Sequence, residues 1–238
     1  SKLDSVVVQE VADVDIWKSL GVSPDRITVA GGLKFDPGGG RLPATREAFS
    51  EMLHACAAGR PVVLGASTHA GEECLLACAV REVGGFFLSV PRHAERRHEV
   101  AAELGEEGFE VVLRSEFSNP KDPGQSCLVV DSTGELRDWT AHSDLVVIGK
   151  SFLGIGGQNP AEAIQARKPL VFGPHMENFE PLVSELVEQG GAIRVEVEDL
   201  VEGLRACLKD SSGKMTSSAA AVLARHDGAT KRTLEVLL

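Results

Sequence analysis

The chain has 238 residues, of which 43% are hydrophobic and 25% charged, and its formal net charge at pH 7 is -11. A chain of this size and composition is expected to form one large domain, or one domain and a fragment, without a metal or a disulfide to hold it together. The acidic balance argues against nucleic-acid binding, which needs a clustered positive field. Five scattered cysteines with no C-x-x-C pair indicate a reducing compartment.

The sequence contains no run of eighteen apolar residues and no basic-then-apolar leader, so we expect neither a membrane span nor an export signal in this chain. It begins at Ser1, and its first residues already have the pattern of a strand. We therefore expect that an N-terminal part of a larger protein precedes it.

Short β-branched runs alternate with amphipathic stretches along most of the chain. The expected strands are Val6–Gln9, Ile27–Ala30, Val62–Gly65, Phe86–Val90, Glu110–Leu113, Leu128–Val130, Leu145–Ile148, Leu170–Phe172 and Ile193–Val195. The expected helices between them include Arg46–Ala58, Glu72–Glu82, Ala94–Leu104 and Phe179–Glu188. Apolar strands that alternate with helices predict an α/β fold, a Rossmann-like parallel sheet with helices on both faces.

One break in this alternation marks a domain boundary. The stretch from Asp36 to Pro43 is rich in glycine and proline and has no periodicity, which is typical of a linker. We expect residues 1–36 to form one piece, 37–43 the linker and 44–214 the main domain. After the polar stretch Asp210–Lys214, a final helix is expected over Met215–Leu237, within residues 215–238.

Ligands of open α/β sheets bind beyond the carboxyl ends of the strands, so the loops there are candidate sites. The loop after Leu145–Ile148 has the strongest pattern, Gly156-Gly157-Gln158-Asn159-Pro160. Asn159 is a good N-cap, Pro160 suits the first helical position, and Glu162 falls at the third. Free N–H groups around the glycines would make an anion site, although a well-capped helix after a flexible loop is the alternative. Glu162 is either part of the cap or an acceptor for ribose hydroxyls.

Two further loops carry polar residues at strand ends. Arg92 ends the strand Phe86–Val90 and suits a phosphate or a carboxylate, or else forms an ordinary surface ion pair. Ser67 and Thr68 follow Val62–Gly65 and either contact a ligand or cap the next helix. A hydrolase nucleophile elbow is excluded here, because His69 stands where that motif needs glycine.

The turn Gly134-Glu135-Leu136 follows the strand Leu128–Val130 and is able to contact a base edge or a sugar hydroxyl, or is simply a junction. Two other patterns are misleading. Gly149-Lys150-Ser151 resembles the end of a P-loop but lacks the required upstream glycine, where Asp144 stands. His93 and His98 are five residues apart, so they do not share a helical face for a metal.

Taken together, six ordered motifs resemble the 3-deoxy-D-manno-octulosonic acid (Kdo) transferases of lipid A assembly. That family has G-N-L-K-F-D, A-S-T-H-x-G-E-E, P-R-H, D-T-x-G-E-L, G-G-H-N-P-x-E and G-P-H-x-x-N-F. The corresponding segments here are Gly31–Asp36, Ala66–Glu73, Pro91–His93, Asp131–Leu136, Gly156–Glu162 and Gly173–Phe179. Two positions depart from the family, with Gln158 in place of histidine and Gly32 in place of asparagine.

The resemblance implies the C-terminal, donor-binding half of a GT-B glycosyltransferase, with residues 1–36 as the tail of its N-terminal domain. The donor would be CMP-Kdo and the acceptor a lipid A precursor, at the cytoplasmic side of the inner membrane. The implied donor-binding residues are Ser67, Thr68, Arg92, Gly134, Glu135, Leu136, Gly156, Gly157, Gln158, Asn159 and Glu162.

The same resemblance places the catalytic base, the acceptor site and any membrane contact in the N-terminal domain. We therefore expect no catalytic residue in this chain, and no metal or cofactor beyond the donor substrate. The final helix would pack back toward the N-terminal domain. Two alternatives remain open: another GT-B transferase or epimerase that uses a UDP-sugar, and a non-catalytic nucleotide-binding module.

Overall fold

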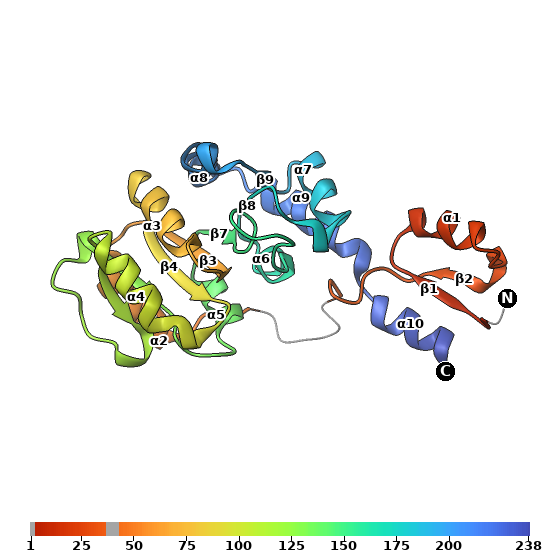
Figure 1. Ribbon diagram of the computed structural model, residues 1–238, viewed down its shortest axis with the longest axis horizontal. Coiled ribbons are helices and arrows are strands. Elements are labelled where there is room, and N and C mark those ends of the chain that lie inside the picture. Colours follow the sequence, from red (N-terminus) through yellow and green to blue (C-terminus); the bar gives the residue numbers. More distant parts are fainter. Residues whose placement is uncertain (1–2, 37–42) are drawn as a thin grey trace. The chain divides into compact units, whose positions relative to one another are not determined.

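The computed structural model describes residues 3–36 and 43–238, so the predicted linker lies outside the described residues except for Pro43. The chain divides into two compact units. The smaller unit contains residues 3–36 and 221–238, and the larger unit contains residues 43–220 (Figure 1).

The larger unit is built on a seven-stranded sheet in the order β5-β6-β4-β3-β7-β8-β9, in which all pairs are parallel. This confirms the predicted α/β fold. The strands are β3 (Val62–Thr68), β4 (Phe86–Pro91), β5 (Glu110–Leu113), β6 (Ser126–Val129), β7 (Leu145–Ile148), β8 (Leu170–Phe172) and β9 (Ile193–Arg194).

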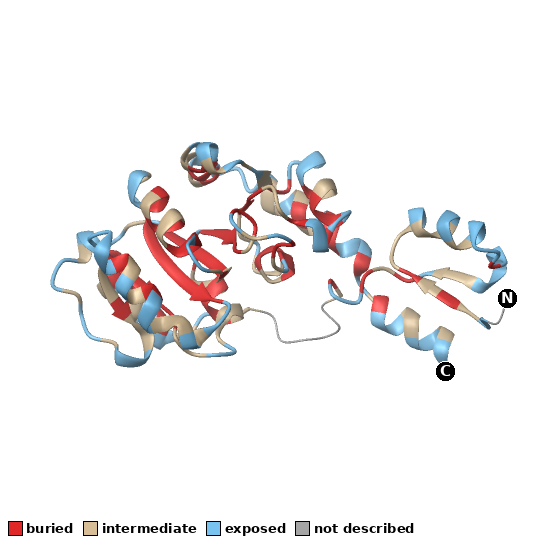
Figure 2. Cartoon of the chain, in the orientation of Figure 1, coloured by how far each residue is buried: buried red, intermediate tan, exposed pale blue. Residues whose placement is uncertain are grey.

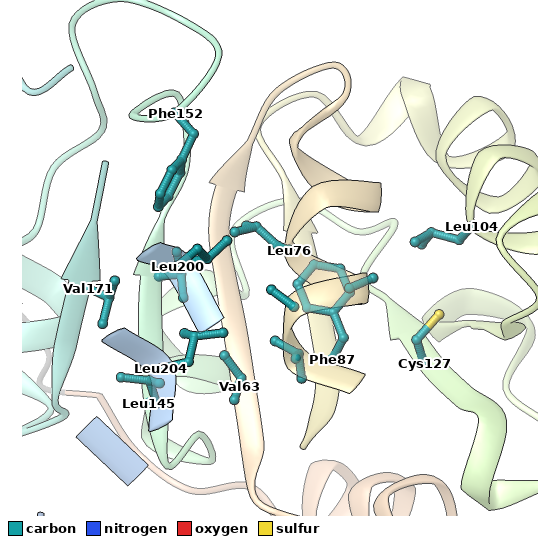
Figure 3. Packing of buried hydrophobic residues seen from close by; sticks show 14 of the residues in the cluster. Val63, Leu76, Phe87, Leu104, Cys127, Leu145, Phe152, Val171, Leu200 and Leu204 are labelled. Atoms are coloured by element: carbon teal, nitrogen blue, oxygen red, sulfur yellow. The ribbon is translucent and has the colours of Figure 1, made fainter. Parts of the chain in front are cut away.

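Helices cover both faces of this sheet. On one face α3 (Glu72–Glu82), α4 (Arg97–Glu106) and α8 (Leu200–Lys209) enclose a buried cluster that includes Val63, Leu76 and Leu204 (Figure 3). The opposite face packs against α2 (Glu47–Ala57), α5 (Leu136–Ala141) and α6 (Ala161–Gln165). The central strands are therefore buried on both sides (Figure 2), which explains their continuous runs of aliphatic residues.

The strand order reverses direction between β3 and β7. From β3 the chain builds outward through β4, and from β7 it builds outward on the other side through β8 and β9. Such a reversal leaves a crevice at the carboxyl ends of the two strands, and ligands of doubly wound sheets bind there. The loops that follow β3 and β7 therefore border the expected binding position.

Several element boundaries differ from the sequence prediction by one to three residues, and for two of them the local structure gives the reason. β3 continues three residues beyond Gly65, because a register shift between Ala66 and Thr68 lets it keep pairing with β4. α7 (Leu182–Glu188) begins after Pro181 rather than at Phe179, where a separate short 3-10 turn ends. Proline favours the first turn of a helix over its interior.

The smaller unit contains a two-stranded parallel sheet of β1 (Val6–Val8) and β2 (Ile27–Val29), joined by α1 (Val11–Ser19). The C-terminal segment is hydrogen-bonded to it. Arg232 donates to the carbonyl oxygen of Ala30 at 2.9 and 2.7 Å, and the backbone N–H of Gly32 donates to Nδ1 of His226 at 3.0 Å. Residues 221–238 are therefore an integral part of this unit.

The prediction of one final helix over Met215–Leu237 is wrong. α9 (Lys214–Leu223) is followed by a 3-10 turn at Ala224–His226, and α10 (Ala229–Leu237) starts afresh. Gly228 breaks the helix with a left-handed φ of 77°, and Asp36 accepts hydrogen bonds from the N–H groups of Gly228 and Thr230. None of the described helices has both the length and the apolarity that a membrane span requires.

Candidate functional site

The end of β3 anchors the loops of both neighbouring strands. The N–H of Arg92, after β4, donates to the carbonyl oxygen of Thr68 at 3.0 Å, and the N–H of Gly149, after β7, donates to that of Ala66 at 2.8 Å. A Cβ on Gly149 would lie 2.5 Å from the carbonyl oxygen of Ser67, so only glycine allows this approach. Adjacent strands are about 4.8 Å apart, which puts the three loops within roughly 10 Å of one another at their origins.

Glu72, in the first turn of α3, holds two of these loops together. Its carboxylate is fully buried and accepts hydrogen bonds from the backbone N–H groups of Lys150 (2.6 Å), Ser151 (3.0 Å), Phe152 (3.1 Å) and His69 (3.0 Å). The turn after β3 and the loop after β7 therefore share one buried acceptor. In the sequence, Glu72 stands out only as part of the segment Ala66–Glu73. The signal that points to it is the pair of glutamates at the start of a helix, directly after a glycine.

Thr68 does not face the candidate site. Its side chain is fully buried, and its hydroxyl donates to Oε1 of Glu73 at 2.9 Å. Burial raises the pKa of Glu73, while Arg96 donates to the same oxygen at 2.9 Å. The predicted ligand contact of the Thr68 side chain is therefore corrected to a supporting role, whereas Ser67 remains partly accessible.

The two glycines of the turn after β7 do not offer free amides. The N–H of Gly156 donates to Oε2 of Glu177 at 2.7 Å, and the N–H of Gly157 donates to the carbonyl oxygen of Lys150 at 3.0 Å. A Cβ on Gly156 would lie 2.3 Å from Nδ2 of Asn178. These glycines serve close packing, and the expectation that their amides bind a phosphate does not fit the structure.

The remainder of that turn fits the prediction better. Oδ1 of Asn159 accepts from the N–H of Ala161 at 2.9 Å, so Asn159 supports the start of α6 as expected, although the helix begins at Ala161, one residue later than predicted, with Pro160 at the N-cap position. Gln158 places its side-chain nitrogen 3.3 Å from Nε2 of His69, and within the described residues its backbone N–H has no partner. Glu162 is paired with Arg137 at 3.3 Å.

A small pocket lies between β3, β7, α5 and α6. Five of the predicted site residues line it: Ser67, Leu136, Gln158, Asn159 and Glu162. Its floor is formed by apolar side chains of the sheet and of α6, among them Val146, Ile148 and Ala163. The structure thus brings together three loops that are separated by up to 95 positions in the sequence, counted from Ser67 to Glu162.

The turn before α5 is held by charged side chains. Arg114 donates to the Glu135 carboxylate through Nε (2.9 Å) and Nη2 (3.0 Å), and Ser132 also donates to it. Burial raises the pKa of Glu135, but the hydrogen bonds from Ser132 and Arg114 outweigh it and hold the pKa below the usual range. Because this carboxylate is already paired, the turn presents Leu136 and its backbone to the pocket. Gly134 adopts a φ of 80°.

Unpaired positive charge collects at the same edge of the sheet. Neither the exposed Arg92 nor the half-buried Lys150 has a side-chain hydrogen bond or ion pair within the described residues. His69 directly follows β3, the strand that lies between β4 and β7, and burial lowers the pKa of His69. The described residues contain no group of three His, Cys, Asp or Glu side chains that could hold a metal ion. The edge is therefore suited to an anionic ligand with polar groups.

Comparison with known proteins supports this interpretation, although no family model matches the chain. It is 33% identical over 248 aligned residues to the 3-deoxy-D-manno-octulosonic acid transferase of Bordetella pertussis, covering 99% of this chain and 56% of the relative. The corresponding transferase of Haemophilus influenzae is 28% identical, with 100% and 57% covered. The chain thus spans a little over half the length of these curated relatives.

Among solved structures, the C-terminal CMP-Kdo binding domain of WaaA from Acinetobacter baumannii is similar, with a TM-score of 0.66, 27% identity, and coverage of 74% of this chain and 96% of that one. Anabaena Alr3699/HepE in complex with UDP shares the fold alone, with a TM-score of 0.58, 16% identity, and coverage of 98% and 63%. The chain is therefore a homologue of the Kdo transferases, and it matches the C-terminal domain of that kind of glycosyltransferase.

Proposed function

We propose that this chain is the donor-binding part of an enzyme that transfers Kdo from CMP-Kdo to a lipid A precursor. The observation that carries the proposal is the pocket between β3 and β7, because its lining comes from three of the six motifs that the chain shares in order with the family. The similar domain from Acinetobacter baumannii is described as binding CMP-Kdo, which supports the same ligand here.

The geometry suggests a role for each part of the pocket. Gln158 supplies a backbone N–H and a side-chain amide, both of which are able to donate hydrogen bonds to a phosphate. Glu162 accepts from ribose hydroxyls while it is paired with Arg137. The turn at Gly134–Leu136 contacts the cytosine through its backbone, since the Glu135 side chain is engaged by Arg114. Arg92 meets an anionic group of the donor.

In the reaction that we propose, an acceptor hydroxyl attacks the anomeric carbon of Kdo and the bond from that carbon to the phosphate oxygen of CMP breaks. The proton of the hydroxyl passes to a base, which the family resemblance places in the part of the relatives that this chain does not span. The role of this chain is to stabilise the negative charge that develops on the departing CMP. The complete enzyme would act at the cytoplasmic side of the inner membrane as a peripheral protein.

Calorimetric titration of the chain with CMP and with UDP tests the ligand class. We expect binding that is selective for CMP. A clear preference for UDP would contradict the proposal and favour a transferase or epimerase that uses a UDP-sugar.

A second assay separates a donor-binding part from a complete catalyst. The chain alone is expected to bind CMP-Kdo but not to transfer Kdo to a lipid A precursor, because the base is supplied elsewhere. Transfer by the isolated chain would refute that division of labour.

A further inference from the structure

Lys150 is held in an unusual position at the carboxyl end of β7. Its backbone has a left-handed φ of 56°, which is unfavourable for a residue with a side chain. Two hydrogen bonds maintain it: the N–H donates to Glu72 at 2.6 Å, and the carbonyl oxygen accepts from Gly157 at 3.0 Å. Strained backbone of this kind is concentrated at functional sites, where surrounding contacts fix it.

The side chain of Lys150 runs over the turn that follows β7. A Cβ built on Gly154 would lie 2.9 Å from Cγ of Lys150, so the stem packs against that glycine. The polar groups of the neighbouring loops are His69, which interacts electrostatically with Lys150, the neutral side-chain amide of Gln158 beside His69, and the buried carboxylate of Glu72. That carboxylate is already occupied by four N–H groups.

Lys150 is a half-buried residue, and the absence of a partner for its ammonium group is informative. The chain has 35 acidic and 24 basic residues, so acidic partners are plentiful elsewhere. Within the described residues, however, neither Lys150 nor Arg92 has a side-chain partner. A charge that no side chain of the protein neutralises is available to a ligand that supplies the opposite charge.

We propose that Lys150 binds the phosphate of the donor and that Arg92 binds its carboxylate. This assignment rests on the proposed function, because CMP-Kdo carries both groups on one anomeric carbon. The carbonyl oxygen of Lys150 accepts a hydrogen bond from the N–H of Gly157. Gly157 directly precedes Gln158, beside which we place the phosphate. Arg92 lies on the other side of β3, and its planar fork matches a carboxylate, whereas an ammonium group acts as a point charge on a phosphate.

The test measures the binding of CMP and of freshly prepared CMP-Kdo to Lys150→Met and to Arg92→Met. Lys150→Met keeps the length of the stem but removes the charge, and it is expected to weaken both ligands alike, by about 10-fold or more. Arg92→Met is expected to weaken CMP-Kdo by about 10-fold or more and to leave CMP within about 3-fold of the wild type.

Lys168→Met is the matched control. Lys168 is also half-buried, but it precedes β8 and so lies at the amino edge of the parallel sheet, away from the site. It is expected to leave both affinities unchanged. Lys150→Arg keeps the charge and should retain CMP binding within about 3-fold. This variant tests the role of the charge even if Lys150→Met folds poorly.

Each outcome decides the assignment. Unchanged CMP binding by Lys150→Met, a loss confined to CMP-Kdo in that variant, or a large loss of CMP binding by Lys150→Arg would overturn it. If the wild-type chain binds neither CMP nor CMP-Kdo, the proposed function itself fails. These two kinds of failure are therefore distinguishable.

Discussion

Replacing Gly156 with alanine tests whether the glycine turn after β7 serves packing. The residue has a φ of 103°, a conformation that side chains rarely adopt, and an added Cβ would lie 2.3 Å from Nδ2 of Asn178. Neither feature involves a ligand. If the structural interpretation is correct, Gly156→Ala destabilises the larger unit even when no ligand is present.

The magnitude follows from two contributions. Forcing a residue with a Cβ into left-handed backbone costs about 1–2 kcal/mol, and displacing the exposed side-chain end of Asn178 adds about 1 kcal/mol, the lower end of the cost of overpacking. Together they lower the free energy of unfolding by roughly 2–3 kcal/mol. Gly134→Ala is the matched control, since its φ is 80° but no atom lies within 4 Å of the added Cβ. It should cost only the backbone contribution.

The assay is urea unfolding followed by the fluorescence of Trp139. The chain has two tryptophans, Trp17 in α1 of the smaller unit and Trp139 in α5 of the larger one, so a Trp17→Phe background reports the larger unit alone. Adding Asn178→Ala to Gly156→Ala should recover the overpacking part of the loss. If Gly156→Ala costs no more than Gly134→Ala, the close contact with Asn178 is refuted.

Three further predictions concern other parts of the molecule. Glu72→Gln should lower the free energy of unfolding of the larger unit by about 1.5–3 kcal/mol, because an amide has one acceptor oxygen for four N–H groups; an unchanged urea midpoint would speak against this. Burial lowers the pKa of His226 below that of the unfolded chain, so the stability of the smaller unit, followed by Trp17 fluorescence, should be full above about pH 6.5 and fall as the pH drops toward the folded pKa. His226→Gln should remove this slope, and a slope that persists would assign it to other groups. Arg232→Met should speed hydrogen exchange in the C-terminal segment 221–238, because two hydrogen bonds to Ala30 are lost; unaltered exchange would contradict their role.

The sequence was sufficient to predict the parallel sheet and the edge that carries the site. Strands such as Leu145–Ile148 are buried on both faces and therefore consist almost wholly of aliphatic residues. Such a run is easily recognised, because no residue in it needs a polar side chain that faces solvent. The sequence indicates that Asn159 supports the start of a helix, because such capping hydrogen bonds join residues only a few positions apart. Local rules of this kind also indicate Ser67, Leu136 and Glu162 as candidate site residues, and all three line the same pocket.

What escaped prediction depends on contacts between distant segments. Glu72 accepts from Lys150, 78 positions later, and nothing in the local sequence reveals that partner. The amides of Gly156 and Gly157 donate to Glu177 and Lys150. The local sequence does not show these partners, and it therefore predicts a ligand site where the two glycines serve packing. Likewise Gly228 breaks the final helix because Asp36 binds the start of α10. Helical periodicity continues through such a break.

The most direct test of the account is hydrogen–deuterium exchange of the wild-type chain with and without CMP. We predict slower exchange in CMP at three separate segments, 67–72, 134–140 and 157–163, each of which contributes residues to the pocket between β3 and β7. The edge strand β5 at the far side of the sheet serves as the internal control and should not change. Protection confined to β5, or binding of CMP without protection at these three segments, would contradict the placement of the donor site.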